Sequence, residues 1–312
     1  MPFALARILT NISLEEVDHM KAQPGGMKKS AVETLKSLGF ALVAVIILNS
    51  FVVASFQVPT PSMENTVMTG DFLFVNKFIY GGTTPPTIPL LGILFGTEIE
   101  IPYFRTPGFR DPEQGDVIVF IFPGYRNETK ARDFQFYLKR CVAVAGDTLQ
   151  VIDKQVYVNG KKYDDPEGVM YVDNNIHPAG IEEDGGIFPE GKPWNRDNYG
   201  PIRIPKEGDV LPLSVDNIKE WAVFIRREGH DVELRGYDIL IDGKKASSYK
   251  VERDYVFGMG DNRDNSLDSR FWGFIPYEYV IGTPMMVYWS MDPSINNIFK
   301  KIRFDRMFTI IG

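Results

Sequence analysis

A run of nineteen residues without a charge, from Leu38 to Phe56, most constrains what this chain of 312 residues can fold into. About 20 apolar residues in a helix are enough to span the hydrocarbon core of a bilayer. The core helix of a soluble protein is an alternative, but such a helix normally carries charged residues along one face. A cleaved signal peptide is a second alternative, but this run is too long and begins far from Met1. We therefore predict one transmembrane helix over residues 38–56.

The charges on either side of the run predict its orientation. Three lysines lie within residues 28–36, whereas the first charged residues after the run are Glu64 and Asp71. Basic flanking residues tend to stay in the cytoplasm. We predict a cytoplasmic N-terminal segment over residues 1–37 and an extracytoplasmic location for everything after the helix.

Composition excludes several kinds of function. A net charge of −7 argues against nucleic acid as the main partner. Because Cys141 is the only cysteine, the chain can form neither an internal disulfide nor a cysteine-rich metal site. Of three histidines, only His177 and His230 follow the apolar run, so at most two can serve the outer part of the chain.

Short β-strands are the dominant signal after residue 57. Apolar segments bounded by Gly, Asp or Pro are typical of strands, and Asn159-Gly160 and Asp242-Gly243 are typical of tight hairpin turns. No long amphipathic helix is evident between residues 57 and 290. The predicted strands cover residues 71–77, 115–122, 136–144, 149–152, 155–158, 239–241, 255–257 and 282–290.

The composition changes partway along this outer part. From about residue 164 to residue 230 it shifts to Gly, Pro, Asp, Glu and Asn with few apolar runs, which indicates an insertion. We predict a mainly β fold in which residues 57–152 and 254–312 form an antiparallel β-sheet domain. Residues 153–253 form an inserted smaller α+β region, and one N-terminal transmembrane helix precedes both.

Ser62, six residues after the apolar run, is the candidate nucleophile. A serine hydroxyl needs a general base, which is usually histidine, but His177 and His230 both lie in the predicted insertion. A lysine can serve if burial among apolar groups lowers its pKa and leaves the amine neutral. Lys139, inside the predicted strand 136–144, has such a setting. The alternative is an exposed charge on a strand edge.

Residues 258–273, GMGDNRDNSLDSRFWG, combine glycines with closely spaced charges. Alternating aspartates could bind calcium, but Arg263 and Arg270 would place positive charge in such a site. A rigid loop held by arginine–aspartate pairs fits the segment better.

Together, these segments resemble bacterial type I signal peptidases and occur in the order found in that family. The resemblance covers the anchor but not residues 1–25 or most of residues 160–250. It depends on FQVPTPSM at 56–63, GD at 70–71, GDVIVF at 115–120, YLKRCV at 137–142 with GD at 146–147, and GMGDNRDNSLDSR at 258–270.

The resemblance implies a membrane-bound serine endopeptidase that removes N-terminal signal peptides from secreted preproteins and cleaves after a small residue. Residues 57–152 and 254–312 would then be the catalytic domain. The implied location is the bacterial cytoplasmic (inner) membrane, in a single pass, with this domain on the periplasmic face. The implied partners are signal peptides of preproteins, the lipid bilayer and, by proximity, the protein-export channel. No metal and no cofactor are implied.

The resemblance also implies roles for individual residues. Ser62 is expected to be the nucleophile and Lys139 the general base, while Ser266 orients the lysine. Thr60 would stabilise the oxyanion together with the Ser62 backbone N–H. Structural ion pairs are expected between Asp261 and Arg140 and between Asp268 and Arg270. The residues expected to line shallow substrate pockets are Phe56, Val58, Met63, Val67, Tyr137 and Leu138.

Two other functions fit parts of the sequence. A scaffold of the same fold that has lost activity is one, but the intact set of Ser62, Lys139 and Ser266 argues against it. A self-cleaving repressor also uses a serine–lysine pair, but it needs a DNA-binding domain and no anchor. Residues 299–308 are both basic and apolar, which fits either a contact with the membrane surface or a solvated tail.

Overall fold

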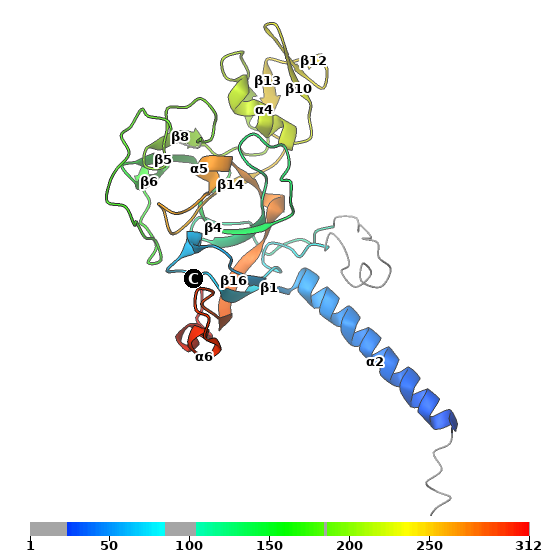
Figure 1. The fold of residues 1–312 in the computed structure, drawn as a ribbon. Coiled ribbons are helices and arrows are strands. Elements are labelled where there is room, and N and C mark those ends of the chain that lie inside the picture. The colour runs from blue at the N-terminus through cyan, green and yellow to red at the C-terminus, as the bar shows by residue number, and fades with distance from the viewer. Residues whose placement is uncertain (1–23, 85–103, 184–185, 312) are drawn as a thin grey trace, which may run out of the picture. The chain divides into compact units, whose positions relative to one another are not determined.

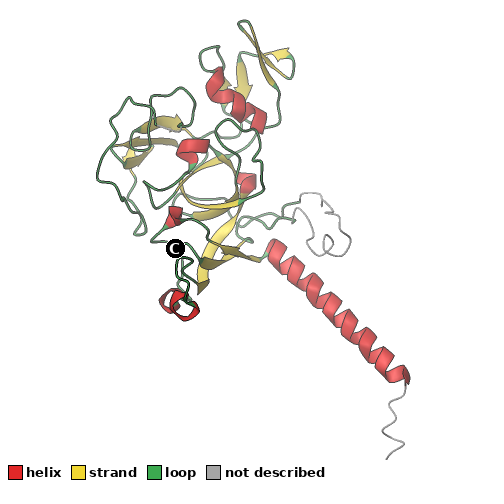
Figure 2. Ribbon diagram, viewed as in Figure 1, coloured by secondary structure: helices red, strands yellow, loops and turns green. Residues whose placement is uncertain are grey.

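The computed structural model describes residues 24–84, 104–183 and 186–311 (Figure 1). The chain divides into two compact units, Met1–Leu48 and Asn49–Gly312. Strands form most of the regular structure of the second unit (Figure 2). The helices and 3₁₀ turns are α2 (Pro24–Phe51), η1 (Pro61–Met63), α4 (Ile218–Arg227), α5 (Ser269–Trp272), η2 (Tyr277–Tyr279), α6 (Ile298–Lys301) and η3 (Phe304–Arg306).

The strands form four antiparallel sheets, with orders β1-β2-β16-β3-β4-β14-β15, β7-β6-β5-β8, β10-β11-β12 and β13-β9. This arrangement confirms the predicted mainly β, antiparallel fold. The strands are β1 (Val53–Gln57), β2 (Asp71–Asn76), β3 (Val117–Ile121), β4 (Phe136–Ala143), β5 (Thr148–Ile152), β6 (Gln155–Val158), β7 (Lys161–Lys162), β8 (Tyr199–Arg203), β9 (Val210–Pro212), β10 (Val232–Arg235), β11 (Asp238–Ile241), β12 (Lys244–Lys245), β13 (Ser248–Lys250), β14 (Tyr255–Met259), β15 (Ile275–Pro276) and β16 (Val280–Ser290).

Helix α2 contains the predicted apolar run but ends earlier than the sequence suggested. Its segment Val32–Phe51 is long and apolar enough to cross a membrane, by length and composition. The predicted helix end at Phe56 is wrong, because residues 53–57 form β1 and pair with β2, with Phe56 opposite Leu73. Hydropathy does not distinguish a helix from a strand, and the β-branched Val52 and Val53 favour a strand once a partner is available.

The long strand β16 connects the two halves of the seven-stranded sheet. It pairs with β2 through Thr283–Ser290 and with β3 through Val280 and Gly282. Gly282 lies against the backbone of β2, where a Cβ atom would be 2.3 Å from the carbonyl oxygen of Asn76. Glycine at this position therefore allows the close approach of the two strands.

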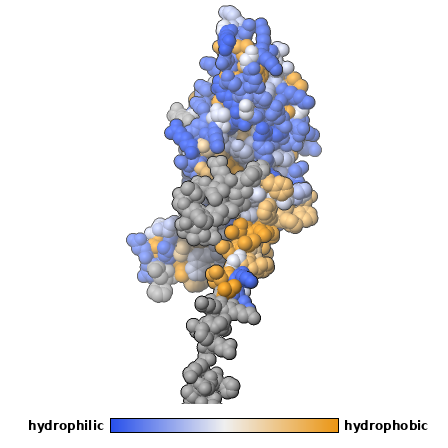
Figure 3. All heavy atoms as spheres, turned by 90° about the vertical axis from the view of Figure 1, so that its right-hand side faces the viewer, coloured by the Kyte–Doolittle hydropathy of each residue, from blue (hydrophilic) through white to orange (hydrophobic). Residues whose placement is uncertain are grey.

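The predicted insertion, residues 153–253, contributes strands β6–β13 and helix α4. Both predicted hairpin turns are confirmed, since Asn159, Gly160, Asp242 and Gly243 all have the positive φ angles of such turns. The sequence pattern missed α4, which is amphipathic but only 10 residues long. The end of the molecule that carries α4 and β10–β13 is mostly hydrophilic on its surface (Figure 3).

Residues 153–253 share a hydrophobic core with the rest of the unit. Ile187, Tyr199 and Ile225 from this region belong to the same buried cluster as Val142 and Phe257. β5, which ends at residue 152, also pairs directly with β6. The insertion is therefore packed firmly enough to hold loops of the main sheet in place.

The C-terminal segment pairs back onto β16. Val287 N donates to Thr309 O at 2.9 Å, and Phe308 N donates to Val287 O at 2.7 Å. Arg306 from this segment donates to the buried carboxylate of Asp71 at 2.7 Å, which also accepts from Ser290 Oγ at 2.6 Å. Asp71 therefore joins β2, the end of β16 and the C-terminal segment.

We expect Asp71→Ala to lower the free energy of unfolding by about 3 kcal/mol, because it leaves a partly buried arginine without its partner. Chemical denaturation of the detergent-solubilised chain measures this loss. Glu233→Ala, which breaks the exposed pair with Arg235, is the control and is expected to cost less than about 1 kcal/mol. Equal losses in the two variants would contradict the role of Asp71.

Candidate active site

Ser62 lies in the short turn η1, directly after β1. Pro61 begins the turn, and its carbonyl accepts from Glu64 N at 3.0 Å. Met63 packs into the core on one side of the turn, whereas Ser62 lines a cavity. The fold thus holds the serine hydroxyl at a cavity wall on a rigid turn.

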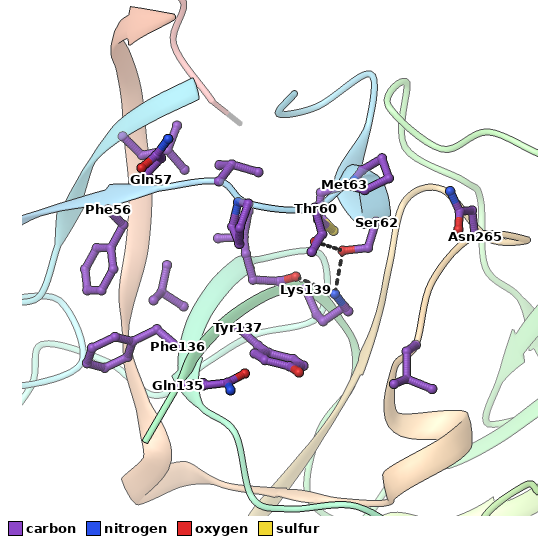
Figure 4. Close-up of a pocket in the computed structure, with 17 residues that line it drawn as sticks. Phe56, Gln57, Thr60, Ser62, Met63, Gln135, Phe136, Tyr137, Lys139 and Asn265 are labelled. Atoms are coloured by element: carbon purple, nitrogen blue, oxygen red, sulfur yellow. Dashed lines mark hydrogen bonds between the residues drawn. The ribbon is translucent and has the colours of Figure 1, made fainter. Parts of the chain in front are cut away.

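Lys139, in the middle of β4, reaches the same cavity (Figure 4). Its Nζ lies 2.7 Å from Ser62 Oγ and donates to Leu138 O at 2.9 Å. Only 3% of Lys139 is exposed, so the predicted alternative of an exposed edge charge does not hold. The structure therefore brings the candidate nucleophile and the candidate base into hydrogen-bond contact, although 77 residues separate them.

Burial lowers the pKa of Lys139 from 10.5 to about 8, because an ammonium ion loses hydration there. Asp268 and Asp261 oppose this shift, and Arg270 adds to it. A substantial fraction of the amine is then neutral near physiological pH and can accept a proton. His177 and His230 instead pair with Asp197 and Asp242, and neither lines the cavity.

The two predicted accessory hydroxyls lie near Ser62 but differ in their contacts. Thr60 Oγ1 is 3.4 Å from Ser62 Oγ. Ser266 is buried, and its Oγ makes no hydrogen bond with any residue that the structure describes. The bond expected between Ser266 and Lys139 is therefore absent in this arrangement. The sequence places Ser266 in the right loop, but the direction of a rotatable hydroxyl depends on local packing.

Gly260 makes room for this arrangement. A Cβ atom on Gly260 would lie 2.1 Å from Ser266 Oγ and 2.5 Å from Ser62 O. A larger residue at position 260 would therefore push the loop that carries Ser266 away from the turn that carries Ser62.

Two buried ion pairs stabilise the loop over residues 261–270, as predicted. Arg140 binds the Asp261 carboxylate through two hydrogen bonds, of 2.9 and 2.8 Å. Arg270 binds Asp268 in the same two-bonded manner, also at 2.9 and 2.8 Å. Each carboxylate near Lys139 thus has its own arginine.

The insertion adds further support to this loop. Met170 N donates to Asp261 O at 2.8 Å, and Arg263 N donates to Met170 O at 3.0 Å. Arg196, also from the insertion, donates to Asp264 O at 2.7 Å. The loop that contacts Ser62 is therefore held from both the main sheet and the inserted region.

The cavity has a volume of about 760 Å³ and mostly apolar walls. Five of the six predicted pocket residues line it: Phe56, Val58, Met63, Tyr137 and Leu138. Val67 is not among the lining residues and is fully buried in the same core cluster as Met63. Sequence reasoning missed several lining residues, because only strand pairing and loop packing bring them there: Gln57, Leu73, Val119, Gln135, Phe136, Asn265 and Leu267.

Comparisons with known proteins agree on one family. The family model "Signal peptidase, peptidase S26" matches residues 31–289. A signal peptidase I of Helicobacter pylori is 30% identical over 280 residues, which are 87% of this chain and 90% of the relative. A signal peptidase I of Haemophilus influenzae is 29% identical over an alignment of 327 positions, which covers 96% of this chain and 80% of the relative. The family model therefore includes the apolar segment Val32–Phe51 and every residue that lines the cavity.

The burial of Lys139 predicts a gain in stability when its charge is removed. We expect Lys139→Met to raise the free energy of unfolding at pH 7 by as much as about 3 kcal/mol, since a pKa that falls from 10.5 to about 8 penalises the folded ammonium form. The penalty is complete below about pH 8 and disappears as the pH rises toward 10.5, so the gain should shrink over that range.

Denaturation at several pH values measures this gain. Lys162→Met, at an exposed position on β7, is the control and should show no such dependence on pH. A Lys139→Met variant that is less stable than the wild type at pH 7 would contradict the argument.

Proposed function

The chain belongs to the signal peptidase family, peptidase S26, and we propose that it is a membrane-anchored hydrolase that cleaves signal peptides with Ser62 as nucleophile and Lys139 as general base. The observation that carries the proposal is the 2.7 Å contact between Ser62 Oγ and the buried amine of Lys139. A hydroxyl within hydrogen-bond reach of a neutral amine is an activated nucleophile.

In the first step, Ser62 Oγ attacks the scissile carbonyl while Lys139 Nζ takes the hydroxyl proton. The resulting ammonium then gives this proton to the amine of the leaving chain, which becomes the new N-terminus of the mature protein. Water next attacks the acyl-enzyme, Lys139 again takes a proton, and Ser62 Oγ recovers one as the signal peptide leaves. One residue thus serves as base and then as acid.

Thr60 and Ser266 support these steps. The Thr60 hydroxyl and the Ser62 backbone N–H are the donors proposed for the oxyanion, and each such donor contributes a few kcal/mol. The hydroxyl of Ser266 is without a hydrogen bond among the described residues, and we propose that it turns toward Lys139 when Nζ becomes protonated. It would then hold the ammonium in place between the two proton transfers.

The substrate is proposed to bind as an extra strand beside β4. Residues 136–139 pair with β3 on one side, whereas β14 pairs only with residues 140–143 on the other. Backbone groups of residues 136–139 therefore remain available on the cavity side. An added strand gives affinity through main-chain hydrogen bonds, and pockets for alternate side chains give specificity. Shallow apolar walls would admit only small side chains near the scissile bond.

The helix α2 is proposed as the membrane anchor, with the N-terminus in the cytoplasm. An apolar N-terminal helix and the matching relatives are consistent with a single-pass protein of the inner membrane. Residues 57–152 and 254–312 would form the catalytic domain on the outer face, and residues 153–253 the insertion that supports it. Signal peptides are apolar segments delivered by the export channel, so an anchored enzyme meets them at the bilayer.

Cleavage of a preprotein by the detergent-solubilised chain tests the two catalytic residues. We expect Ser62→Ala and Lys139→Ala each to lower kcat/KM by at least about 10²-fold, because a positioned general base raises the rate by about 10²-fold or more. The exposed Lys162→Ala is the control and should keep wild-type activity. Full cleavage by either active-site variant would rule out the proposed pair.

The dependence of cleavage on pH tests the base separately. Burial lowers the pKa of Lys139 to about 8. Because only the neutral amine accepts the serine proton, kcat/KM should rise with pH and level off above about pH 8. A rate that is constant from mildly acidic to alkaline pH would contradict a lysine base.

A further inference from the structure

The cavity extends past Ser62 to two side chains that the proposed steps do not use. Asn265 and Leu267, both from the loop over residues 261–270, line it. Asn265 lies on the opposite side of Ser62 from Phe56 and Phe136 (Figure 4). The cavity therefore has an aromatic end beside β1 and β4 and a second end at this loop.

Leu267 is an exposed apolar side chain between two buried residues. It is 45% exposed, whereas its neighbours Ser266 and Asp268 are 6% and 0% exposed. On one side Asp264 accepts hydrogen bonds from Lys154 Nζ at 3.0 Å and from Val172 N at 2.8 Å. On the other side Asp268 is bound by Arg270. Leu267 is thus held at the cavity wall by its fixed neighbours.

The direction of the substrate follows from the proposed function, on which this inference rests. If the signal peptide lies beside residues 136–139 of β4, the part before the scissile bond occupies the aromatic end. The chain after the scissile bond must then leave over Asn265 and Leu267. The second end of the cavity is therefore the place where the mature protein begins.

Side chains of an extended chain alternate between two faces. The small residue before the scissile bond and the residue two positions earlier both point into the enzyme, so the next side chain to do so is the second residue after the bond. We propose that Leu267 and Asn265 form the subsite for this second residue of the mature protein and favour an apolar side chain there. Leu267 supplies apolar contact, and the Asn265 amide can bond the adjacent substrate backbone.

A charge-swap experiment tests the subsite. The detergent-solubilised wild type, Leu267→Glu and Leu267→Lys are each assayed on preproteins that differ only in having Leu, Lys or Glu as the second mature residue. We expect the wild type to cleave the Leu substrate fastest. Leu267→Glu should prefer Lys over Glu, and Leu267→Lys should prefer Glu over Lys, each by about 3–5-fold in kcat/KM, as expected for exposed charge pairs.

Leu234→Glu is the matched control, because Leu234 on β10 is 48% exposed and does not line the cavity. This variant should keep the wild-type order of substrates. Equal rates on all three preproteins in every Leu267 variant would overturn the proposal, and so would the wild-type order of substrates in both charged variants. A failure of the proposed function would give a different result, because neither the wild type nor any variant would then cleave any preprotein. That result would also rule out the subsite.

Discussion

The chemistry of this site depends on keeping the amine of Lys139 away from water without giving it a carboxylate partner. Asp261 and Asp268 both lie near enough to raise its pKa. Each of them is instead bound by an arginine through two hydrogen bonds, and such two-bonded pairs are strong and directional. Arg140 and Arg270 therefore do more than stabilise the loop. They neutralise the two negative charges that would otherwise keep the Lys139 amine as an ammonium ion.

This constraint explains why so much of the chain surrounds a site of few residues. The loop that carries Asp261 and Asp268 must be held against both β4 and the turn of Ser62. The insertion does this through backbone bonds from Met170. It also packs Gly168 against Thr66, where a Cβ atom would be 1.9 Å from Thr66 Oγ1, and Thr66 in turn donates to Asp261 at 2.5 Å. The inserted region thus contributes to the electrostatics of Lys139, although none of its described residues lines the cavity.

Local sequence patterns predicted eight of the strands and the two hairpins, because these depend on neighbouring residues, but they left open whether Lys139 is buried or an exposed edge charge. The arginine–aspartate loop was predicted for the same reason. Features that depend on distant partners were missed or wrong. The helix ends at Phe51 because β2 pairs with the following residues. Val67 is buried in the core, whereas Leu267 lines the cavity. Both residues are apolar, so residue type alone does not predict which of them faces the cavity.

A second buried lysine shows that a lowered pKa alone does not identify a base. Burial lowers the pKa of Lys77 to about 8, as it does for Lys139. The Lys77 amine, however, lies 3.5 Å from Asn49 O in the last turn of α2, and its backbone N–H donates to Val52 O at 2.9 Å. A cation at this position stabilises the carbonyl end of a helix. Among the described residues the Lys77 amine donates to no hydroxyl, and Lys77 does not line the cavity. The contact of Lys139 with Ser62, inside the cavity, is therefore what separates the proposed catalytic lysine from a structural one.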